Sequence, residues 1–412
     1  MAGTGASVAL GRLGPLAAQR RESVRADIYA NVGPRLLRYR IAADRQSLVE
    51  LGEPTVLPEE IQEACQWGRF LYVASSDEHT AADPRNHYLH AFEVDSSGAL
   101  EPIGEPVRLR RRPIHITVDA RGEHVLAAFN NPSGVAVHRL NAEGSVGSEV
   151  AQEASLDAGV YAHQIRVMPS GRAVIVPARG NQGVPGVREE DRGALKVFGY
   201  ADGRLTNRQS VAPNEGREFR CRHVEFHPSG RWAYVAIESQ NELHTFSIVD
   251  DRLSPGPLFV TSLLASPSRS RQGQAASAIR MHPTNGRTLY VANRGRGKEV
   301  FRGEEVISED MENSIAVLAV DPGTGEPRLI QSADPQSIDV RMFALHPDGR
   351  SLVATSHESE GPIKRRRGNE IEIVPPRIVL FSIEADGTLT FRYKQDVQTE
   401  GLFQLWCGAV QY

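Results

Sequence analysis

The strongest constraint on the fold is an internal repeat that recurs through the chain. One part of it is a glycine-containing turn followed by a strand rich in β-branched and aromatic residues, as in PSGRWAYVAIES from Pro228 and PTNGRTLYVANRG from Pro283. A second strand, of the type LHTFSI, follows each copy, and seven such strands occur at intervals of roughly 45 to 70 residues. Because periods of this length are typical of repeat architectures, the repeat is interpreted before any single element.

Each repeat predicts four short antiparallel strands. A polar strand such as ALEPIGEPVRL and an entering strand such as PIHITVDA lie between successive copies, and 37 Gly and 25 Pro spread along the chain suit many short strands. The predicted fold class is therefore all-β, a seven-bladed β-propeller of four-stranded antiparallel blades. The first copy, from Ala26, lacks its entering strand, whereas the chain ends in the apolar segment LFQLWCGAVQY. We expect this C-terminal strand to complete the first blade and close the ring, which removes exposed sheet edges.

The repeat also sets the expected domain boundaries. Residues 26–412 are predicted to form a single propeller domain, and residues 1–25 a disordered leader, since their charges follow the apolar part, unlike those of a secretory signal. Four longer insertions interrupt the repeats, at residues 180–193, 266–276, 295–312 and 358–376. All but 266–276 fall between the second and third strands of a blade, so we expect the insertions to wall one mouth of the ring.

Composition excludes several classes of partner. The formal net charge of -4 gives no overall attraction for nucleic acid or an anionic membrane. No apolar run approaches the ~18 residues that a membrane helix needs. The three cysteines, Cys65, Cys221 and Cys407, have no metal-ligand spacing and form an intracellular pattern. We therefore expect a cytoplasmic protein without nucleic-acid or membrane partners, and leave its oligomeric state open.

Polar residues recur at the open ends of the hairpins. Counting eight residues before and after each turn glycine selects Arg222 and Glu238 around Gly230, and such positions are neighbours across an uninterrupted antiparallel hairpin. In the other blades the same count selects His163 with Arg179, Asn130 with His115 one step inside, Arg294, and Arg341 with His357. If these positions only served packing, the same position in each blade would favour the same residue type. The residues at the open ends instead differ from blade to blade. This favours a site at one end of the channel; the alternative is a set of rim charges that merely pair with one another.

The residue types indicate an anionic substrate. Arginines offer bidentate donors to carboxylate or phosphate. His163 has the pKa range for proton transfer, and Glu238 serves as a base or orients water. We expect Arg222 to hold the pKa of Glu238 down, which would make Glu238 the base or water-orienting group and His163 the proton donor. Covalent catalysis is disfavoured because G-x-S-x-G is absent and Cys221 is expected to point away from Arg222.

Metal and phosphate-loop chemistry is not predicted. His227, His282 and His346 occupy one repeated position before the turn proline, which favours a structural turn residue over a metal ligand. The remaining histidines show no familiar ligand spacing, and neither a P-loop nor a Rossmann fingerprint occurs.

Three segments resemble the seven-bladed propeller lactonases, which include bacterial 6-phosphogluconolactonases and have fungal 3-carboxymuconate lactonizing enzyme as a relative. They are PIHITVDARGEHVLAAFNN, CRHVEFHPSGRWAYVAIESQNELHTFSI and SAIRMHPTNGRTLYVANRG, within a resemblance over roughly residues 26–412. The resemblance implies hydrolysis of a sugar-acid lactone without metal or organic cofactor. It assigns catalysis to His163, Arg222, Glu238 and Arg294, which leaves His115, Asn130, Arg179, Arg341 and His357 to bind substrate.

Three departures from the family pattern put the substrate in question. Cys221 stands where a proline is usual, Ile237 where an asparagine is usual, and Arg280 where a histidine is usual. In the leading hypothesis, Arg222 and Arg294 bind the anionic group and polarise the lactone carbonyl, while His163 or Glu238 activates water. A muconate-type cycloisomerase, with arginines on two carboxylates, is the first alternative. A non-enzymatic scaffold is the second, although the loops are rich in Arg, Glu and Gly and no WD dipeptide occurs.

Overall fold

The computed structural model describes residues 25–79, 81, 83, 85–184, 186–267, 273–295, 299–302, 305–308, 311–356, 363–367 and 369–412. The predicted leader, apart from Arg25, and the candidate residue His357 lie outside these residues.

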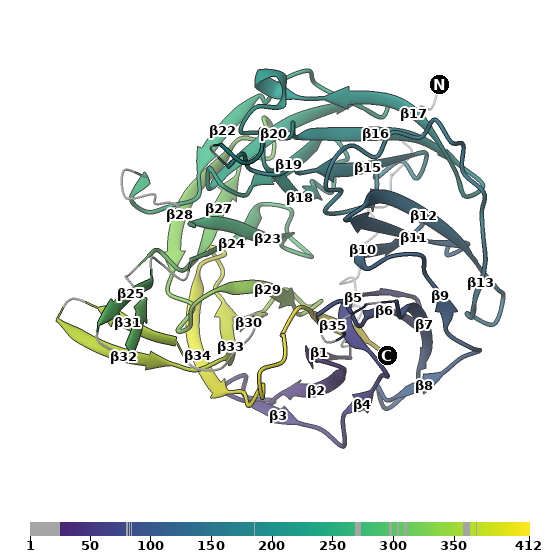
Figure 1. The fold of residues 1–412 in the computed structure, drawn as a ribbon. Helices are drawn as coiled ribbons and strands as arrows, with labels where there is room; N and C mark the ends of the chain where they lie inside the picture. Colours follow the sequence, from purple (N-terminus) through teal and green to yellow (C-terminus); the bar gives the residue numbers. More distant parts are fainter. Residues whose placement is uncertain are drawn as a thin grey trace, which may run out of the picture.

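Seven antiparallel sheets form a ring of blades, which confirms the predicted propeller (Figure 1). The innermost strands are β35 (Cys407–Gln411), β5 (Glu60–Trp67), β10 (Pro113–Val118), β14 (Arg166–Val167), β18 (Cys221–Phe226), β23 (Ala275–Met281) and β29 (Val340–Leu345). The second strands are β1 (Ala26–Val32), β6 (Phe70–Ser76), β11 (His124–Asn130), β15 (Ala173–Ala178), β19 (Trp232–Ile237), β24 (Thr288–Arg294) and β30 (Ser351–Ser356). The third strands are β2 (Arg35–Ile41), β7 (His87–Val94), β12 (Ser133–Leu140), β16 (Ala194–Ala201), β20 (Glu242–Val249), β27 (Ser314–Val320) and β33 (Arg377–Ile383).

The outer edge of each blade is less regular. Its strands are β3 (Leu48–Glu50) with β4 (Thr55–Val56), β8 (Leu100–Pro102) with β9 (Val107–Arg108), β13 (Val146–Glu149), β17 (Arg204–Val211), β21 (Arg252–Leu253) with β22 (Phe259–Ser262), β28 (Pro327–Ala333) and β34 (Leu389–Asp396). A short 3-10 segment, η1 (Pro213–Gly216), precedes β18.

The C-terminal strand closes the ring as predicted. β35 pairs antiparallel with β1, from Ala26 opposite Gln411 to Ala30 opposite Cys407. The fully buried Asn31 reinforces this seam, since its Oδ1 accepts the backbone N–H groups of Leu405 at 2.9 Å and Trp406 at 2.8 Å. The first blade therefore joins both ends of the described chain.

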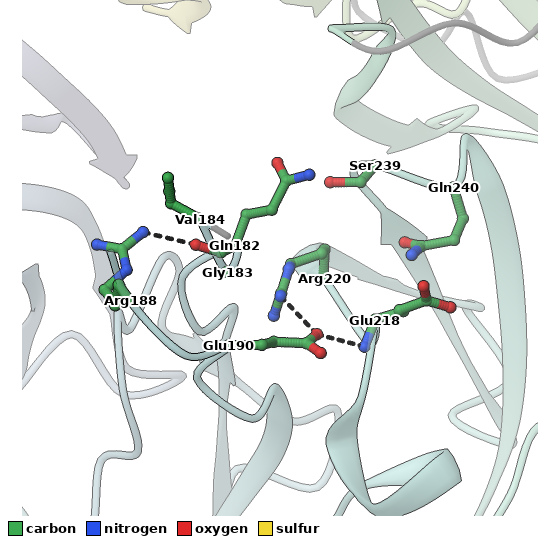
Figure 2. Close-up of a pocket in the computed structure, with 9 residues that line it drawn as sticks. All are labelled: Gln182, Gly183, Val184, Arg188, Glu190, Glu218, Arg220, Ser239 and Gln240. Carbon is green, nitrogen blue, oxygen red and sulfur yellow. Dashed lines mark hydrogen bonds and ion pairs between the residues drawn. The ribbon is translucent and has the colours of Figure 1, made fainter. Parts of the chain in front are cut away.

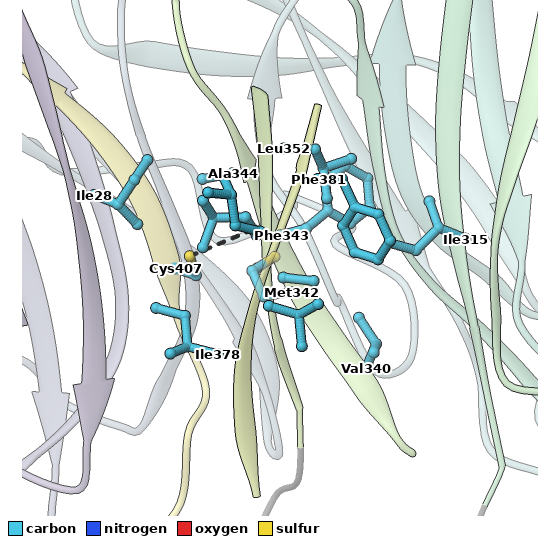
Figure 3. Close-up of a cluster of buried hydrophobic side chains, with 14 of the residues drawn as sticks. Ile28, Ile315, Val340, Met342, Phe343, Ala344, Leu352, Ile378, Phe381 and Cys407 are labelled. Atoms are coloured by element: carbon cyan, nitrogen blue, oxygen red, sulfur yellow. Dashed lines mark hydrogen bonds between the residues drawn. The ribbon is translucent and has the colours of Figure 1, made fainter. Parts of the chain in front are cut away.

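The second strands are buried from end to end because neighbouring blades cover both faces of each sheet. β19, with the sequence WAYVAI, and β15, with AVIVPA, have no exposed position. Figure 3 shows the seam around blade 7, where Phe343 and Phe381 pack among aliphatic side chains from neighbouring blades. Cys407 of β35 belongs to the same cluster, so the strand that closes the ring is also part of the hydrophobic core.

Two of the three repeated turn histidines, His227 and His282, connect one blade to the next, as expected of structural residues. Nε2–H of His227 donates to the carbonyl oxygen of Gly286, and Nε2–H of His282 donates to that of Gly349, each at 2.9 Å. The other ring nitrogen accepts a turn N–H, from Ser229 onto His227 at 3.1 Å. Glycine is required at 349, because φ is 73° and a Cβ would lie 2.4 Å from the His282 ring.

The register of the hairpins differs from the uninterrupted pairing that the residue count assumed. In β18, pairing stops at Cys221 and resumes at His223, so Arg222 is the extra residue of a bulge. Similar shifts occur in the innermost strands at Gln62, Ile114 and Arg341. The N–H of Glu238 consequently donates to the carbonyl of Arg220 at 2.8 Å, not to that of Arg222. A bulge redirects a side chain from the sheet face, here toward one end of the ring.

Two insertions combine into a sheet that the sequence did not predict. β25 (Glu299–Arg302) and β26 (Glu305–Ser308) come from blade 6, and β31 (Ile363–Arg367) and β32 (Glu370–Val374) from blade 7. The hairpins meet through a parallel pairing of β26 with β31. In Figure 1 this sheet projects outward beside β34 and not over the centre of the ring, in contrast to the expected wall around the mouth.

Candidate active site

Four of the predicted site residues meet in one group, here called the arginine–glutamate cluster: Arg179, Arg222, Glu238 and Arg294. The Glu238 carboxylate contacts Arg179 Nη1 at 2.5 Å, Arg294 Nη2 at 2.8 Å and Arg222 Nε at 3.3 Å. Arg179 and Glu238 directly follow β15 and β19, Arg222 lies at the bulge of β18, and Arg294 is the last residue of β24. Three consecutive blades therefore supply one ion network. The rim-charge alternative thus describes part of the arrangement, because the charges do pair with one another.

Burial makes this network electrostatically strong. Arg222 is 1% exposed and Glu238 is 6% exposed. Burial by itself would raise the pKa of Glu238, but Arg179, Arg222 and Arg294 outweigh it and lower that pKa to about 2. The carboxylate is therefore ionised throughout the neutral range, as expected, and its lone pairs are committed to guanidinium groups. Such a group orients the arginines far better than it accepts a proton.

His163 lies beside the cluster in a neutral state. It is 5% exposed, and its backbone N–H donates to the carbonyl of Pro177 at 2.9 Å, which fixes the main chain. Burial, followed by the positive charge of Arg222 and Arg179, holds the pKa of His163 well below 6.5. Within the described part of the chain, its buried Nδ1 has no hydrogen-bond partner. A buried ring nitrogen left unpaired beside arginines is a candidate contact for water or substrate.

A row of buried rings continues inward from His163. The centroid of His223 lies 5.2 Å from that of His163 and 6.3 Å from that of His115. Burial also holds the pKa values of His223 and His115 well below 6.5. Gln164 positions this row, because its Oε1 accepts the N–H of Val224 at 2.7 Å and its Nε2 lies 3.3 Å from His115 Nε2. His223 therefore lies between His163 and His115 in this row. Within the described residues, His115 makes no ion pair.

The remaining predicted binding residues have different positions. Arg341 is half-buried at the bulge of β29, and its charge contributes to the low pKa of His163. Asn130 is buried at the end of β11, opposite Ser133, where the cis Asn131–Pro132 bond begins the turn into β12. No hydrogen bond within the described residues joins Asn130 to the cluster.

Two ionisable residues of this region, Glu63 and Asp339, were not selected by counting from the turns. Glu63 is buried in β5, and burial raises its pKa to about 7 despite nearby Arg280. Asp339, also buried, lies 3.6 Å from Arg294 Nη1. Glu63 follows the bulge at Gln62, and Asp339 lies two residues before the bulge at Arg341. Neither is eight residues from a turn glycine, so the count along the sequence could not select them.

Two other chemistries lie away from the cluster. Cys221 packs in an apolar core and burial raises its pKa to about 12, so its thiol is protonated and directed away from Arg222, as predicted. Asp119, Glu123 and His124 place potential metal-ligating atoms within 4.8 Å of one another. However, Asp119 already accepts hydrogen bonds from the Tyr200 hydroxyl at 2.8 Å and the Glu123 N–H at 2.9 Å. We assign no metal to this turn.

Known proteins resemble this chain over most of its length. It is 28% identical over 319 residues to 6-phosphogluconolactonase of Bacillus subtilis (strain 168), covering 74% of this chain and 82% of that protein. It is 27% identical over 269 residues to 6-phosphogluconolactonase of Sodalis glossinidius (strain morsitans), covering 65% and 71% respectively.

Solved structures share the fold. The periplasmic gluconolactonase PpgL of Pseudomonas aeruginosa matches with a TM-score of 0.71 and 18% identity, covering 93% of this chain and 99% of that one. A Lactobacillus plantarum protein matches with a TM-score of 0.68 and 16% identity, covering 94% and 100%. The sequence also matches the family described as "Lactonase, 7-bladed beta-propeller" over residues 43–362, well over half of its length. The chain therefore belongs to the seven-bladed β-propeller lactonase family.

Proposed function

We propose that this protein is a lactonase that hydrolyses a sugar-acid lactone at the arginine–glutamate cluster, with 6-phosphogluconolactone as the first candidate substrate. Family membership and the names of the similar bacterial proteins support the reaction. The observation that carries the site assignment is the unpaired Nδ1 of the neutral, buried His163 beside Arg222 and Arg179. Attack of water on a carbonyl needs a proton acceptor, which His163 supplies, and positive charge near the carbonyl oxygen, which the arginines supply.

The proposed mechanism assigns His163 as the general base. Its neutral imidazole takes a proton from water while the water oxygen bonds to the lactone carbonyl carbon. Arg222 and Arg294 stabilise the oxyanion that forms. The ring C–O bond then breaks, and the imidazolium returns the proton to the departing ring oxygen. Glu238 remains a carboxylate that holds the arginines in place. This assignment changes the roles that the sequence favoured. The low pKa of His163 opposes a proton donor. Glu238 has the low pKa that was expected, but its carboxylate is bonded to three arginines, which favours an anchoring role over that of a base.

A direct assay tests the reaction class. Proton release in a pH-stat, corrected for spontaneous hydrolysis, is expected with glucono-δ-lactone or its 6-phosphate. Loss of muconate absorbance is measured in parallel. If the protein consumes muconate and opens no lactone, the hydrolytic assignment is wrong and cycloisomerisation takes its place.

We also propose a cytoplasmic location and a single propeller domain for residues 26–412. The cysteines Cys65, Cys221 and Cys407 are all free, which is typical of a reducing compartment. No helix in the described part of the chain is long and apolar enough to cross a membrane. Cell fractionation, with a periplasmic protein as a marker, tests the location.

A further inference from the structure

A cavity lies next to the arginine–glutamate cluster, at the open ends of the hairpins of blades 4 and 5. Its volume is about 550 Å³, within the range of ~300–1,000 Å³ usual for small-molecule sites. Figure 2 shows the residues that line it, which come from the insertion at 180–193, the approach to β18 and the β19–β20 connection. They are Gln182, Gly183, Val184, Arg188, Glu190, Glu218, Arg220, Ser239 and Gln240.

Each wall of the cavity continues directly from the cluster. Ser239 and Gln240 follow Glu238, and Gln182 is the third residue after Arg179. Arg220, two residues before Arg222, donates from Nη1 to the carbonyl of Arg179 at 3.4 Å. Three residues of extended chain span roughly 10 Å at most. The cavity is thus within reach of a substituent on a molecule that is bound at the cluster.

The insertion that forms one wall has its own internal structure. The Val184 N–H donates to the carbonyl of Arg188 at 2.8 Å, and Asn181 Nδ2 donates to Asp191 Oδ2 at 2.8 Å. At its end, the N–H of Gly193 donates to the carbonyl of Gly216 at 2.9 Å. Hydrogen bonds at both ends and across the tip hold this wall against the segment before β18.

Arg188, Glu190 and Arg220 already have hydrogen-bond partners within the cavity lining. Glu190 Oε1 accepts from Arg220 Nη2 at 2.5 Å and from the N–H of Glu218 at 2.6 Å, as drawn in Figure 2. Arg188 donates to the carbonyl of Gln182 at 2.6 Å. Two arginines face two glutamates in the lining. In the adjoining cluster, by contrast, the arginines outnumber the carboxylate three to one. A phosphate in the cavity would meet two carboxylates, so the balance favours an uncharged ligand.

The remaining lining groups suit hydroxyl groups. Gln182, Ser239 and Gln240 supply amides and a hydroxyl, which both donate and accept hydrogen bonds. The Oε1 of Gln240 is buried and, among the described residues, accepts no hydrogen bond. Val184 is the one aliphatic side chain in the lining. An acceptor left unsatisfied at the edge of a polar cavity is a place for a ligand hydroxyl.

We infer that this cavity binds an uncharged, hydroxyl-rich substituent of the lactone, namely a glycosyl unit, while the lactone ring lies at the cluster. The preferred substrate class is then the lactone of a glycosylated sugar acid, which replaces 6-phosphogluconolactone, the first candidate from the similar proteins. This inference rests on the proposed lactonase function and specifies its substrate. The cluster binds the reacting lactone carbonyl, and the cavity sets specificity through Gln182, Ser239 and Gln240.

The test compares three lactones under the same pH-stat conditions: glucono-δ-lactone, its 6-phosphate, and cellobiono-δ-lactone, which carries a neutral glucosyl unit. Two or three additional hydrogen bonds predict a kcat/KM for cellobiono-δ-lactone about tenfold above that for glucono-δ-lactone. In the double variant Gln182→Ala/Gln240→Ala this ratio should fall to about one. Gln46→Ala, an exposed amide between β2 and β3, is the matched control and should keep the wild-type ratio.

The outcomes separate this inference from the function on which it rests. Hydrolysis of glucono-δ-lactone without a preference for cellobiono-δ-lactone overturns the cavity assignment and leaves the lactonase intact, as does a preference for the 6-phosphate. A ratio unchanged in the double variant, with thermal unfolding confirming that it is folded, also overturns it. If no lactone is opened, the proposed function fails. In that case calorimetry with cellobionate and gluconate still tests the cavity, because tighter binding of cellobionate supports it and equal binding overturns it.

Discussion

The two ends of the blade hairpins use histidine in different ways. At the turn end, His227 and His282 occupy the same repeat position, and each makes the same contact to the glycine carbonyl of the next blade. At the open end, His163 lies among arginines and has no counterpart in the neighbouring blades. Repeated identity marks the residues that hold the ring together, and variation at equivalent positions marks the candidate site.

A low pKa does not distinguish the two kinds of histidine. Burial lowers the pKa of His227 and His282 as it lowers that of His163. The difference is in hydrogen bonding, because both ring nitrogens of His227 have partners and Nδ1 of His163 has none among the described residues. His115, His124 and His244 also have a buried ring nitrogen without a partner among the described residues. What distinguishes His163 is such a nitrogen together with the charges of Arg222 and Arg179. The variants below test that distinction.

The largest effect is expected from Glu238→Gln. Removing the shared carboxylate leaves the buried Arg222 and the half-buried Arg179 and Arg294 to repel one another. The kcat/KM should therefore fall by about a hundredfold or more and the free energy of unfolding by about 3 kcal/mol. Lactone assays and urea unfolding at neutral pH measure both. Glu400→Gln is the matched control, since Glu400 forms an exposed pair with Arg35 at 3.4 Å. Its cost should stay below about 1 kcal/mol. If Glu238→Gln and Glu400→Gln changed kcat/KM and the free energy of unfolding equally, Glu238 at the open end of its hairpin would be no different from an exposed surface residue.

The same carboxylate predicts how stability depends on pH. Its folded pKa of about 2 lies below the ordinary 4.5, so its contribution is complete above 4.5 and is lost as the pH falls toward 2. Wild type should therefore lose more stability than Glu238→Gln across this interval, by on the order of 3 kcal/mol. Urea midpoints through the interval measure the difference. Parallel curves for the two proteins would contradict the network.

His163→Ala should lower kcat/KM by about a hundredfold. A base with a pKa well below 6.5 is deprotonated at 6.5, so wild-type kcat/KM should stay constant as the pH falls through 6.5 and decline only at lower pH. The variant should lack this acidic limb. His138→Ala, which removes a buried histidine bonded to the Gly147 carbonyl at 3.3 Å, is the control and should keep the limb. A decline of wild-type kcat/KM centred at pH 6.5 would show that His163 is solvated, and its assignment as a buried, neutral base would be wrong.

The smallest effect on activity is expected at the turns. His282→Ala removes the donor to the Gly349 carbonyl and the acceptor of the Thr284 N–H, so the free energy of unfolding should fall by about 1–3 kcal/mol. At temperatures where the variant is folded, its kcat/KM should match that of wild type. His282→Gln, which can restore one contact, should lose less stability. A loss of kcat/KM as deep as that of His163→Ala would remove the distinction between the two hairpin ends.

The sequence by itself determined the scaffold of this protein. The repeated glycine turns and strands predicted the blades, the missing entering strand at Ala26 predicted closure by the C-terminal strand, and variation at the open ends selected the cluster residues. These features are readable because each depends on contacts within one repeat or between equivalent repeats. The strand period and the turn chemistry carry that information locally.

Tertiary structure alone decided the register, the protonation states and the neighbours of the site. The bulge at Arg222 accompanies the contact of its side chain with Glu238, so counting residues along the hairpin does not predict it. The pKa of His163 depends on burial and on arginines from other blades. The appended sheet and the cavity beside Glu238 each combine segments that are distant in sequence. Such properties arise from electrostatic and packing contacts between segments, and a pattern within one segment does not contain them.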